Sequence, residues 1–447
     1  MTATFNDLIA SELHLHILGA YTTEDMLALA RDCYRQVDWN EEDFMETYNR
    51  LCEETIDPVA LFEDALSSDT GMERLRRAYV YGNEDGGNFA RWEIKNRLFL
   101  CVWGHYRKND REHELLDRLL ARDRESPRRY VEYRCGSGMG GFLFWHELCA
   151  RVLMEASNEQ FSARYIVSIP RYAPMEAYDL LQQILDQHPD LVPTIVGVDF
   201  ASVEEGNPPT DVRPFFERLQ QDNNRRPQRA LDAVYHVGES YFDKSLESAI
   251  RWCHEVAEMG ACRIGHAIAL GLDPEVAIAR QSGAHEVESV RERLDQVRYD
   301  LLHAEALAAL GVRTDVSELE TERRELERLG PEETVRRMYD AGRIAEVRQR
   351  QTYVLDCLVR MGTVIESCPT SNLRIGGVPE PQAYPIFRFL ETDVDLAICT
   401  DDPGGFDVTL EHEVEWVVRH GDWTRERLAE RLGDPYRFRL GQRREQT

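Results

Sequence analysis

The sequence predicts a closed (β/α)8 barrel of the TIM type, on three observations. The chain has 447 residues, 43% of them hydrophobic, which is enough for one large core. Short runs rich in Val, Ile and aromatic residues alternate with longer helical stretches, a pattern typical of a parallel sheet built from βα units. Polar side chains gather at the ends of these runs, where such a barrel carries its chemistry. We therefore expect a single barrel domain over residues 1–447.

Eight runs can be assigned as strands in chain order. They are 12–18 (ELHLHIL), 129–135 (RYVEYRC), 163–169 (ARYIVSI), 193–201 (PTIVGVDFA), 232–239 (DAVYHVGE), 262–268 (CRIGHAI), 363–368 (TVIESC) and 394–401 (VDLAICTD). If these strands are parallel, their C-terminal ends meet at one mouth of the barrel, and the functional side chains should lie there.

Two connections are longer than the others. The one between the first and second strands opens with a helix, for which Thr22 and Asp25 have capping-box spacing. The one between the sixth and seventh strands is predicted to be a helical insertion at about 271–350, in which residues 314–328 form a solvated helix. Apolar residues spaced alternately by three and four predict a heptad-like seam in it. They are Val287, Val290, Leu294, Val297, Leu301, Ala304 and Ala308.

The seam has two interpretations, which the sequence leaves open. The helix either packs on its own barrel, or it forms an oligomer or assembly interface or an active-site lid. A formal net charge of −28 argues against nucleic acid or anionic membrane as a partner, which leaves a small-molecule ligand. No apolar run is long enough to span a bilayer, no signal peptide is visible, and the ten cysteines are scattered singly, so we expect reduced thiols and a cytoplasmic location.

Histidines near two strand ends indicate a metal site. His14 and His16 lie two apart on the first strand, so both imidazoles can face the barrel mouth and bind one ion. His236 could supply a third imidazole from the fifth strand. Gly238 lets the backbone turn there so that Glu239 reaches the same pocket, where a confined carboxyl can keep its proton.

Two later strands end in further polar groups. His266 closes the sixth strand and could act as a base or as an electrostatic stabiliser. Asp401 and Asp402 follow the apolar run of the eighth strand, and two adjacent buried carboxylates call for a cation or for hydrogen bonds. The order HxH, HxxE, GH and DD at successive strand ends indicates one shared metal centre.

These motifs resemble the adenosine deaminase family of the amidohydrolase superfamily. The matching segments are residues 12–16 (ELHLH) with Gly19-Ala20, 236–239 (HVGE), 263–266 (RIGH), 366–372 (ESCPTSN), 400–403 (TDDP) and 436–439 (YRFR). The resemblance implies one Zn²⁺ held by four ligands. They are His14, His16, His236 and Asp401.

The resemblance also implies the catalytic roles and a purine substrate. Glu239 would donate a proton to purine N1, His266 would help to deprotonate a zinc-bound water, and Asp402 would orient the attacking hydroxide. The product would be an inosine-type base and ammonia. None of the three lysines lies on a predicted strand, so no carboxylated lysine can bridge two metals, and the site should hold one ion.

Two departures from the family bear on the substrate. Leu18, next to Gly19, stands where the family usually has an acid that contacts the ribose 5′-hydroxyl, and its absence removes a barrier to a 5′-phosphate. Ser202 stands where the family has a glycine near purine N3, and its backbone N–H could still serve. Leu18, Gly19, Ser202 and Asp402 are thus the expected substrate contacts. The substrate is adenosine or deoxyadenosine, or a 5′-phosphorylated or 5′-modified form, for which Arg134 or Arg171 could grip phosphate.

The sequence also bears on three other functions. His303-Ala304-Glu305 matches the first half of a cytidine deaminase zinc motif, but no PCxxC follows, so we reject that function. A different amidohydrolase reaction remains an alternative, because such barrels host many chemistries. So does a role as the catalytic or nucleotide-sensing subunit of a larger assembly, for example in anti-phage defence.

Overall fold

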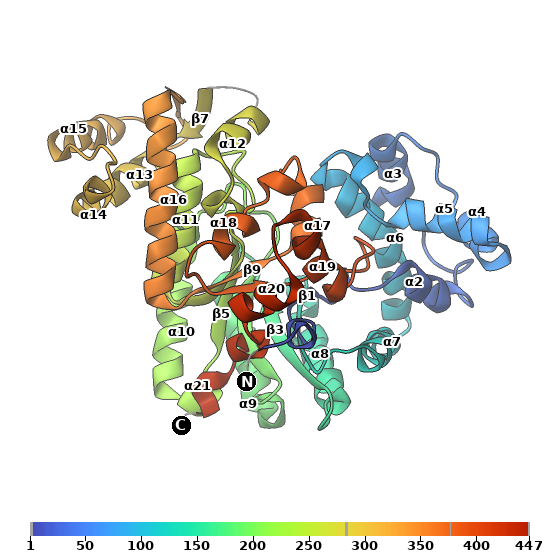
Figure 1. Cartoon of the computed structure of the whole chain (residues 1–447). Helices are drawn as coiled ribbons and strands as arrows, with labels where there is room; N and C mark the ends of the chain where they lie inside the picture. The colour runs from blue at the N-terminus through green and yellow to red at the C-terminus, as the bar shows by residue number, and fades with distance from the viewer. Residues whose placement is uncertain (1–2, 282–284, 376, 446–447) are drawn as a thin grey trace.

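The computed structural model describes residues 3–281, 285–375 and 377–445. Eight parallel strands form one sheet in the order β1-β2-β3-β4-β5-β6-β9-β10 (Figure 1). Their bounds are Ser11–His16, Tyr130–Cys135, Ser162–Ser168, Ile195–Phe200, Asp232–Val237, Ala261–His266, Val364–Ser367 and Leu396–Ile398. A parallel bridge between Leu15 and Asp401 joins the first strand to the segment after the last, so the predicted barrel is confirmed.

The barrel strands are buried on both faces because helices cover the outside of the sheet. Their residues are nearly all inaccessible, which explains the apolar character of β4 and β5, whereas β1 and β2 also bury the polar residues Glu12, His14, Glu132 and Arg134. The covering helices are α8 (Phe142–Ala156), α9 (Pro174–Gln187), α10 (Arg213–Arg225), α11 (Leu246–Met259), α16 (Ala341–Met361), α17 (Pro369–Arg374), α18 (Ile386–Leu390), α19 (Leu410–His420) and α20 (Arg425–Leu432).

The first long connection forms a helical lobe beside the barrel, drawn in blue to cyan in Figure 1. Its helices are α2 (Thr23–Ala30), α3 (Phe44–Cys52), α4 (Pro58–Ser67), α5 (Asp69–Tyr79), α6 (Phe89–Lys108) and α7 (Glu112–Glu125). The predicted capping box is present, because the Thr22 hydroxyl accepts from the Asp25 N–H and the Asp25 carboxylate accepts from the Thr22 N–H.

The second long connection lies between β6 and β9 and differs from the predicted all-helical insertion. It contains α12 (Pro274–Arg280), α13 (Val290–Leu302), α14 (Ala304–Ala309), α15 (Val316–Leu326) and an antiparallel hairpin of β7 (His285–Ser289) with β8 (Thr334–Met338). Val287 therefore belongs to a strand, and the predicted seam begins only at Val290. The helix also breaks at His303, so Ala304 and Ala308 lie on a separate short helix.

The seam packs mainly within the insertion. Val290 and Val297 of α13 form a small apolar cluster with Leu319 and Leu326 of α15. The sequence predicts a solvated helix at residues 314–328, but α15 is not fully solvated. Its two buried leucines pack against α13. Helix α13 also contacts α11 of the barrel, where Arg251 pairs with Glu292.

The end of the barrel opposite the predicted site is closed by the C-terminal segment. A 3-10 turn at Pro435–Phe438 precedes Leu440, which packs against apolar residues of β3, β4 and β5. The Leu440 N–H donates to Glu132 inside the barrel, and the guanidinium of Arg263 donates to the Phe438 carbonyl. Helix α1 (Phe5–Leu8) and α21 (Gln442–Glu445) lie at the two ends of the chain.

Two further expectations from the sequence concern membrane-spanning helices and the state of the cysteines. Within the described ranges, no helix combines the length and the apolar character needed to cross a bilayer. All ten cysteines have free thiols, and eight of them are buried.

Candidate active site

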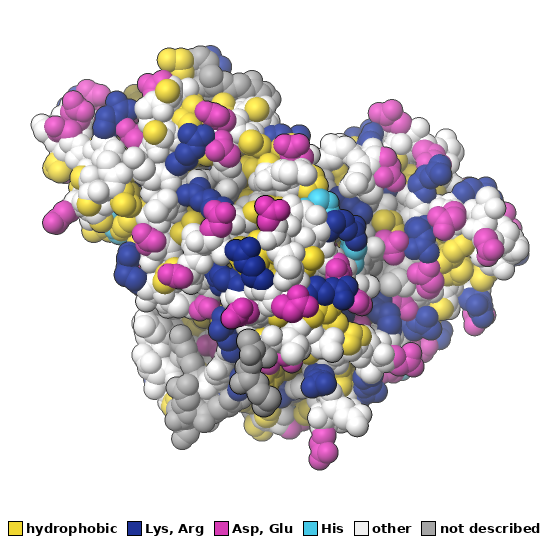
Figure 2. Space-filling model, viewed as in Figure 1, with side chains coloured by type: hydrophobic (Ala, Val, Ile, Leu, Met, Phe, Trp, Pro, Cys, Tyr) yellow, Lys and Arg dark blue, Asp and Glu magenta, His cyan; other side chains and the backbone are white. Residues whose placement is uncertain are grey.

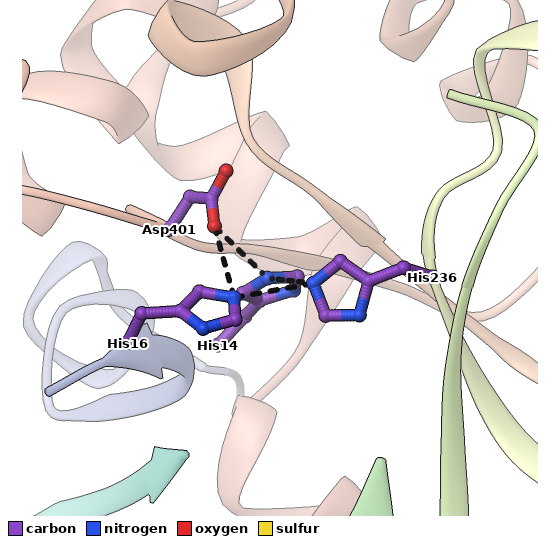
Figure 3. A group of neighbouring side chains, drawn as sticks. All are labelled: His14, His16, His236 and Asp401. Atoms are coloured by element: carbon purple, nitrogen blue, oxygen red, sulfur yellow. Dashed lines mark hydrogen bonds and ion pairs between the residues drawn. The ribbon is translucent and has the colours of Figure 1, made fainter. Parts of the chain in front are cut away.

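Four side chains predicted as metal ligands meet at the C-terminal mouth of the barrel. His14 and His16 come from β1, His236 from β5, and Asp401 from the turn after β10, and all four point toward one another (Figure 3). One ligand atom of each lies within 4.8 Å of the others. The four residues that the resemblance implied as ligands therefore form one cluster.

The donor atoms have the spacing of ligands around a single ion. The Nε2 atoms of His14 and His236 lie 3.0 Å apart, and Asp401 Oδ1 lies 3.2 Å from His14 Nε2 and 3.3 Å from His16 Nε2. Tetrahedral zinc with bonds of roughly 2.0–2.2 Å places its ligands about 3.3 Å apart. Three imidazoles and one carboxylate thus fit Zn²⁺ in both chemistry and distance.

Three of the four candidate ligands are held by a second polar group that lies behind the ligand atom. Glu366 Oε2 lies 2.8 Å from His14 Nδ1, and Asp199 Oδ1 lies 3.0 Å from His236 Nδ1. The Ser371 hydroxyl donates to Asp401 Oδ2 at 2.7 Å. Carboxylates behind ligating histidines fix the ring orientation and leave Nε2 directed at the metal.

The surroundings of the four candidate ligands stabilise positive charge between them. Burial and the nearby Arg134 oppose protonation of His14, but Asp401 and Glu366 outweigh both and raise its pKa to about 9. Burial would raise the pKa of Asp401, yet its hydrogen bond to His14 and the surrounding histidines hold that pKa well below its usual range. Asp401 is therefore ionised and can act as an anionic ligand.

Glu239 lies at the edge of the same pocket and keeps its proton. Its side chain is 26% exposed. Burial, followed by the charges of Asp401 and Glu204, raises the pKa of Glu239 well above that of an ordinary glutamate. A protonated carboxyl facing the pocket can donate to a basic ring nitrogen.

Glu204 positions this part of the site, and the sequence analysis did not single it out. It is 5% exposed, and its carboxylate accepts the backbone N–H groups of Gly238, Glu239 and Ser240, each at 3.0 Å. Lys244 lies 3.9 Å away. The carboxylate therefore clamps the turn that carries Glu239.

His266 and Asp402 complete the pocket floor. The Asn372 amide lies 2.9 Å from His266 Nδ1, while His266 Nε2 is 3.7 Å from Glu239. Burial, as the largest of several causes, lowers the pKa of His266 to about 3, so its ring is neutral. Burial and the adjacent Asp401 raise the pKa of Asp402.

Gly19 makes room for Asp402. A Cβ atom at Gly19 would lie 1.7 Å from Asp402 Oδ1, so any larger residue would push this carboxyl out of place. The Gly19 carbonyl also accepts the N–H groups of Gly404 and Gly405. Gly19 lines the pocket as expected, and it has this packing role as well.

Strained backbone gathers at the mouth of the barrel. Nine described residues other than glycine have a left-handed φ, and four of them follow barrel strands: Ser202, His266, Ala267 and Asp401. Such conformations cost about 1–3 kcal/mol each and cluster at functional sites. Ser202 has φ 73°, a left-handed conformation that glycine adopts more readily than serine.

The enclosed pocket above the metal ligands has a volume of about 260 Å³. Besides the residues already named, it is lined by Leu18 and by residues of α6 and the segment after α17. These are Phe89, Trp92, Glu93, Asn96 and Ile375. Of the described residues around this pocket, Arg134 is the only arginine or lysine.

Arg134 and Arg171 were the two arginines considered as phosphate ligands, and both are engaged by other groups of the protein. Arg134 is fully buried and lies 3.1 Å from Glu366 and 3.4 Å from Asp199, between the carboxylates that support two metal ligands. Arg171 donates to the carbonyls of Ala201, Phe200 and His236. Both hold strand ends in place.

A larger cavity of about 720 Å³ lies on the other side of α17 but contains none of the predicted catalytic residues. Its lining includes Arg280, Arg374, Arg419, His412 and His420. Figure 2 shows histidine and arginine side chains together at this surface over α17 and α19. Because it lacks the metal ligands, Glu239 and Asp402, we place the chemistry in the smaller pocket.

Asp199 and Glu204 could have been found from one signal in the sequence. Each is an acid at or just after the apolar run of β4, as Asp401 is after β10. Buried acids of this kind need a partner. The partners, His236 and the 238–240 turn, could not be named because both lie on another strand.

Replacement of Gly238 by alanine should damage the site through the backbone. Gly238 has φ 69°, and a Cβ atom would lie 2.6 Å from Cys253 Sγ. We expect a loss of about 1–2 kcal/mol in the free energy of unfolding from the left-handed backbone, plus the cost of the clash, and a displaced Glu239 with lower kcat. Urea denaturation and steady-state assays measure the two effects. Gly362→Ala is the matched control, with φ 67° and nothing within 4 Å, and an equal loss in both variants would contradict the clash.

Comparison with known proteins connects this site to one family. The family model for adenosine deaminase matches residues 304–433. The adenosine deaminase of Shewanella loihica is 38% identical over 66 residues, which are 15% of this chain and 20% of that protein. The adenosine deaminase-like protein of Drosophila melanogaster is 37% identical over 73 residues, 16% of this chain and 22% of that protein. The chain therefore aligns with only 20–22% of the length of these curated relatives.

Solved structures match over nearly the whole chain. Adenine deaminase from Arthrobacter aurescens has a TM-score of 0.54 at 16% identity and covers 98% of this chain and 96% of that one. The Arabidopsis N6-mAMP deaminase has a TM-score of 0.55 at 14% identity, with 99% and 97% covered. An amidohydrolase from Burkholderia ambifaria with bound zinc has a TM-score of 0.52 at 13% identity, with 99% and 89% covered. These likenesses establish the fold, and the parts of the chain that match the family model and the curated relatives are similar to adenosine deaminases.

Proposed function

We propose that this protein is a zinc-dependent aminohydrolase that replaces the 6-amino group of an adenine nucleoside with oxygen and releases ammonia. The observation that carries the proposal is the set of four donor atoms described above, with Glu239 beside them in one small pocket. The match of residues 304–433 to the adenosine deaminase family model supports the same reaction.

The zinc would be held by His14, His16, His236 and Asp401. When bound, it lowers the pKa of a water molecule toward about 7 and so supplies a nucleophile at neutral pH. Asp199, Glu366 and Ser371 keep the ligands oriented through the contacts given above.

The chain's own residues then handle the protons. Glu239 donates its carboxyl proton to N1 of the purine, so that C6 becomes electrophilic and the ring accepts the developing charge. His266 and Asp402, both buried beside the metal ligands, hold the attacking oxygen over C6. The amino group leaves as ammonia, and an inosine-type product remains.

The pocket favours a substrate that is neutral at its 5′ end. By the resemblance to the family, Leu18 lies on the 5′ side of the ribose. The pocket residues from α6 and the segment after α17 are mainly apolar, with Glu93 the added acid. Arg134 is already occupied by two carboxylates. A phosphate would find no counter-charge there, so of the two substrate classes we propose adenosine or deoxyadenosine.

The test is a panel of adenine, adenosine, deoxyadenosine, AMP, dAMP and ATP on zinc-loaded protein, followed by ultraviolet absorbance and ammonia release. We expect turnover of a nucleoside, with kcat/KM for its 5′-monophosphate lower by about 100-fold or more, because an unpaired charge in a confined pocket costs several kcal/mol. Efficient turnover of AMP would overturn the proposed 5′ preference. No turnover of any compound by fully metallated protein would overturn the enzymatic function itself.

Leu18→Asp should sharpen this discrimination. The new carboxylate is expected to repel a 5′-phosphate and to lower the kcat/KM ratio of AMP to adenosine by a further factor of about 10. Leu18→Asn has the same shape without the charge and is the matched control. An equal change in both variants would mean that size, not charge, governs this end of the pocket.

The sequence also raised the prospect of a larger assembly formed through the 271–350 insertion. That role stays a prediction.

A further inference from the structure

A second group of metal-binding side chains lies outside the barrel mouth, between the barrel and the insertion. One ligand atom each of His254, Glu258 and His303 lies within 4.8 Å of the others. His254 and Glu258 are one turn apart on α11 and so face the same side of that helix. His303 lies at the break between α13 and α14, which brings a ligand from the insertion to the barrel helix.

Both imidazoles are oriented by tyrosine hydroxyls. His254 Nδ1 lies 2.7 Å from the Tyr299 hydroxyl, and His303 Nδ1 lies 3.0 Å from the Tyr353 hydroxyl. Each ring therefore uses Nδ1 for a hydrogen bond to the protein and leaves Nε2 for another partner. Metal-ligating histidines are held in this way by a polar group behind the ring.

The Nε2 atoms lack ordinary hydrogen bonds. His303 Nε2 is buried and has no hydrogen-bond partner among the described residues. His254 Nε2 is 3.7 Å from Glu258 Oε1, which is too long for a hydrogen bond. A buried polar atom left without a partner costs about 1–3 kcal/mol, so the arrangement calls for a ligand between the three groups.

The two histidines are neutral and can coordinate. Burial, then the nearby His303 and Arg360, lowers the pKa of His254 to about 4. Burial, opposed by Asp300 and Glu255, lowers the pKa of His303 as well. A neutral imidazole keeps one ring proton, and when Nδ1 donates that proton to the tyrosine hydroxyl the Nε2 lone pair faces the other ligands.

We infer that His254, Glu258 and His303 bind a second Zn²⁺ that ties the insertion to the outer face of the barrel. Two imidazoles and a carboxylate are zinc ligands, and water fills the fourth position of a tetrahedral site. Ligands of such a site lie about 3.3 Å apart. Glu258, whose side chain is 40% exposed, has the freedom to close the remaining gap. The role is structural, because the cluster lies on the outer helix layer and shares no residue with the barrel-mouth ligands.

The experiment measures zinc per chain by elemental analysis, after saturation with zinc and gel filtration, alongside aminohydrolase activity. Wild type should hold two zinc ions, and Glu258→Gln and His303→Gln should each hold one, with affinity for the second lowered at least about 10-fold and activity unchanged. Asp401→Asn should lose the other ion and keep this one. In Asp401→Asn protein, added zinc should raise the unfolding temperature, and this shift should vanish when Glu258→Gln is added.

Matched controls separate a built site from adventitious surface binding. Glu305→Gln removes an exposed acid from α14, and His113→Gln removes an exposed histidine from α7, and neither should change the zinc content. A single zinc in saturated wild type would overturn the inference, as would two zinc ions in Glu258→Gln protein. If His303→Gln fails to fold, Glu258→Gln decides, because its side chain is partly exposed and the replacement keeps its shape.

Discussion

Replacing Glu239 with glutamine is expected to lower kcat by about 10²–10⁴-fold while the zinc content stays that of wild type. Glutamine has nearly the shape of the protonated carboxyl but cannot transfer a proton to the purine. The Glu204 clamp acts on backbone N–H groups, so it should hold the substituted side chain in the same place. Steady-state kinetics and elemental analysis of the same preparation test both halves of the prediction.

The pH profile adds an independent readout. Because the pKa of Glu239 is raised, the carboxyl stays protonated above the usual glutamate range, and activity is lost as the pH rises through that raised pKa. Glu239→Gln protein should not show this loss of activity as the pH rises. Glu176→Gln is the control, since it removes an exposed carboxylate of α9 that does not line the pocket. Loss of zinc together with activity in Glu239→Gln protein would contradict the ligand set.

Arg134→Met is expected to destabilise the barrel by about 3–5 kcal/mol, because it removes the buried cation that Glu366 and Asp199 share, and of these two carboxylates the remaining Arg263 contacts only Glu366. Arg134 is fully inaccessible, so water cannot replace it. The same carboxylates hold two metal ligands, and we therefore expect weaker zinc binding as well. Thermal and urea unfolding, with and without zinc, measure the two effects.

The dependence on pH follows from the same charges. Burial opposes ionisation of Glu366 and Asp199, but Arg134, Arg263 and the ligand histidines hold both pKa values well below the usual range. Their contribution is present above a pH of about 4 and is lost as the pH falls through the depressed folded values. In Arg134→Met the loss should begin at higher pH. Arg164→Met, on the neighbouring strand, removes an arginine that donates to the Ala163 carbonyl, and an equal loss of stability in that variant would refute the role of the ion pairs.

The barrel and its metal cluster could be predicted because both depend on local pattern. Parallel strands covered by helices are buried on both faces, so most of them are rich in apolar residues, and the polar residues near their ends mark the mouth. His14, His16, His236 and Asp401 were identified in this way and do meet in space. The resemblance to a family then supplied the roles that spacing alone could not.

The supporting residues could not be predicted because they act through contacts distant in sequence. Arg134 seemed free to bind phosphate until the fold placed it between Glu366 and Asp199. The clamp by Glu204 depends on a turn on the next strand. The hairpin of β7 and β8 could not be predicted for another reason. Val287 and Val290 happen to have helical spacing, and a strand of five residues is too short for its alternating pattern to be recognised.

The closure of the barrel at Asp401 has a consequence for how the protein matures. Asp401 exchanges backbone hydrogen bonds with His14 and His16, so one residue both completes the ring of strands and completes the ligand set. These partners are separated by nearly the whole chain, and their pairing is among the last that a growing polypeptide can make. A nascent chain therefore has no finished zinc site until its final strand is made, and metal uptake should report the end of folding rather than guide its beginning.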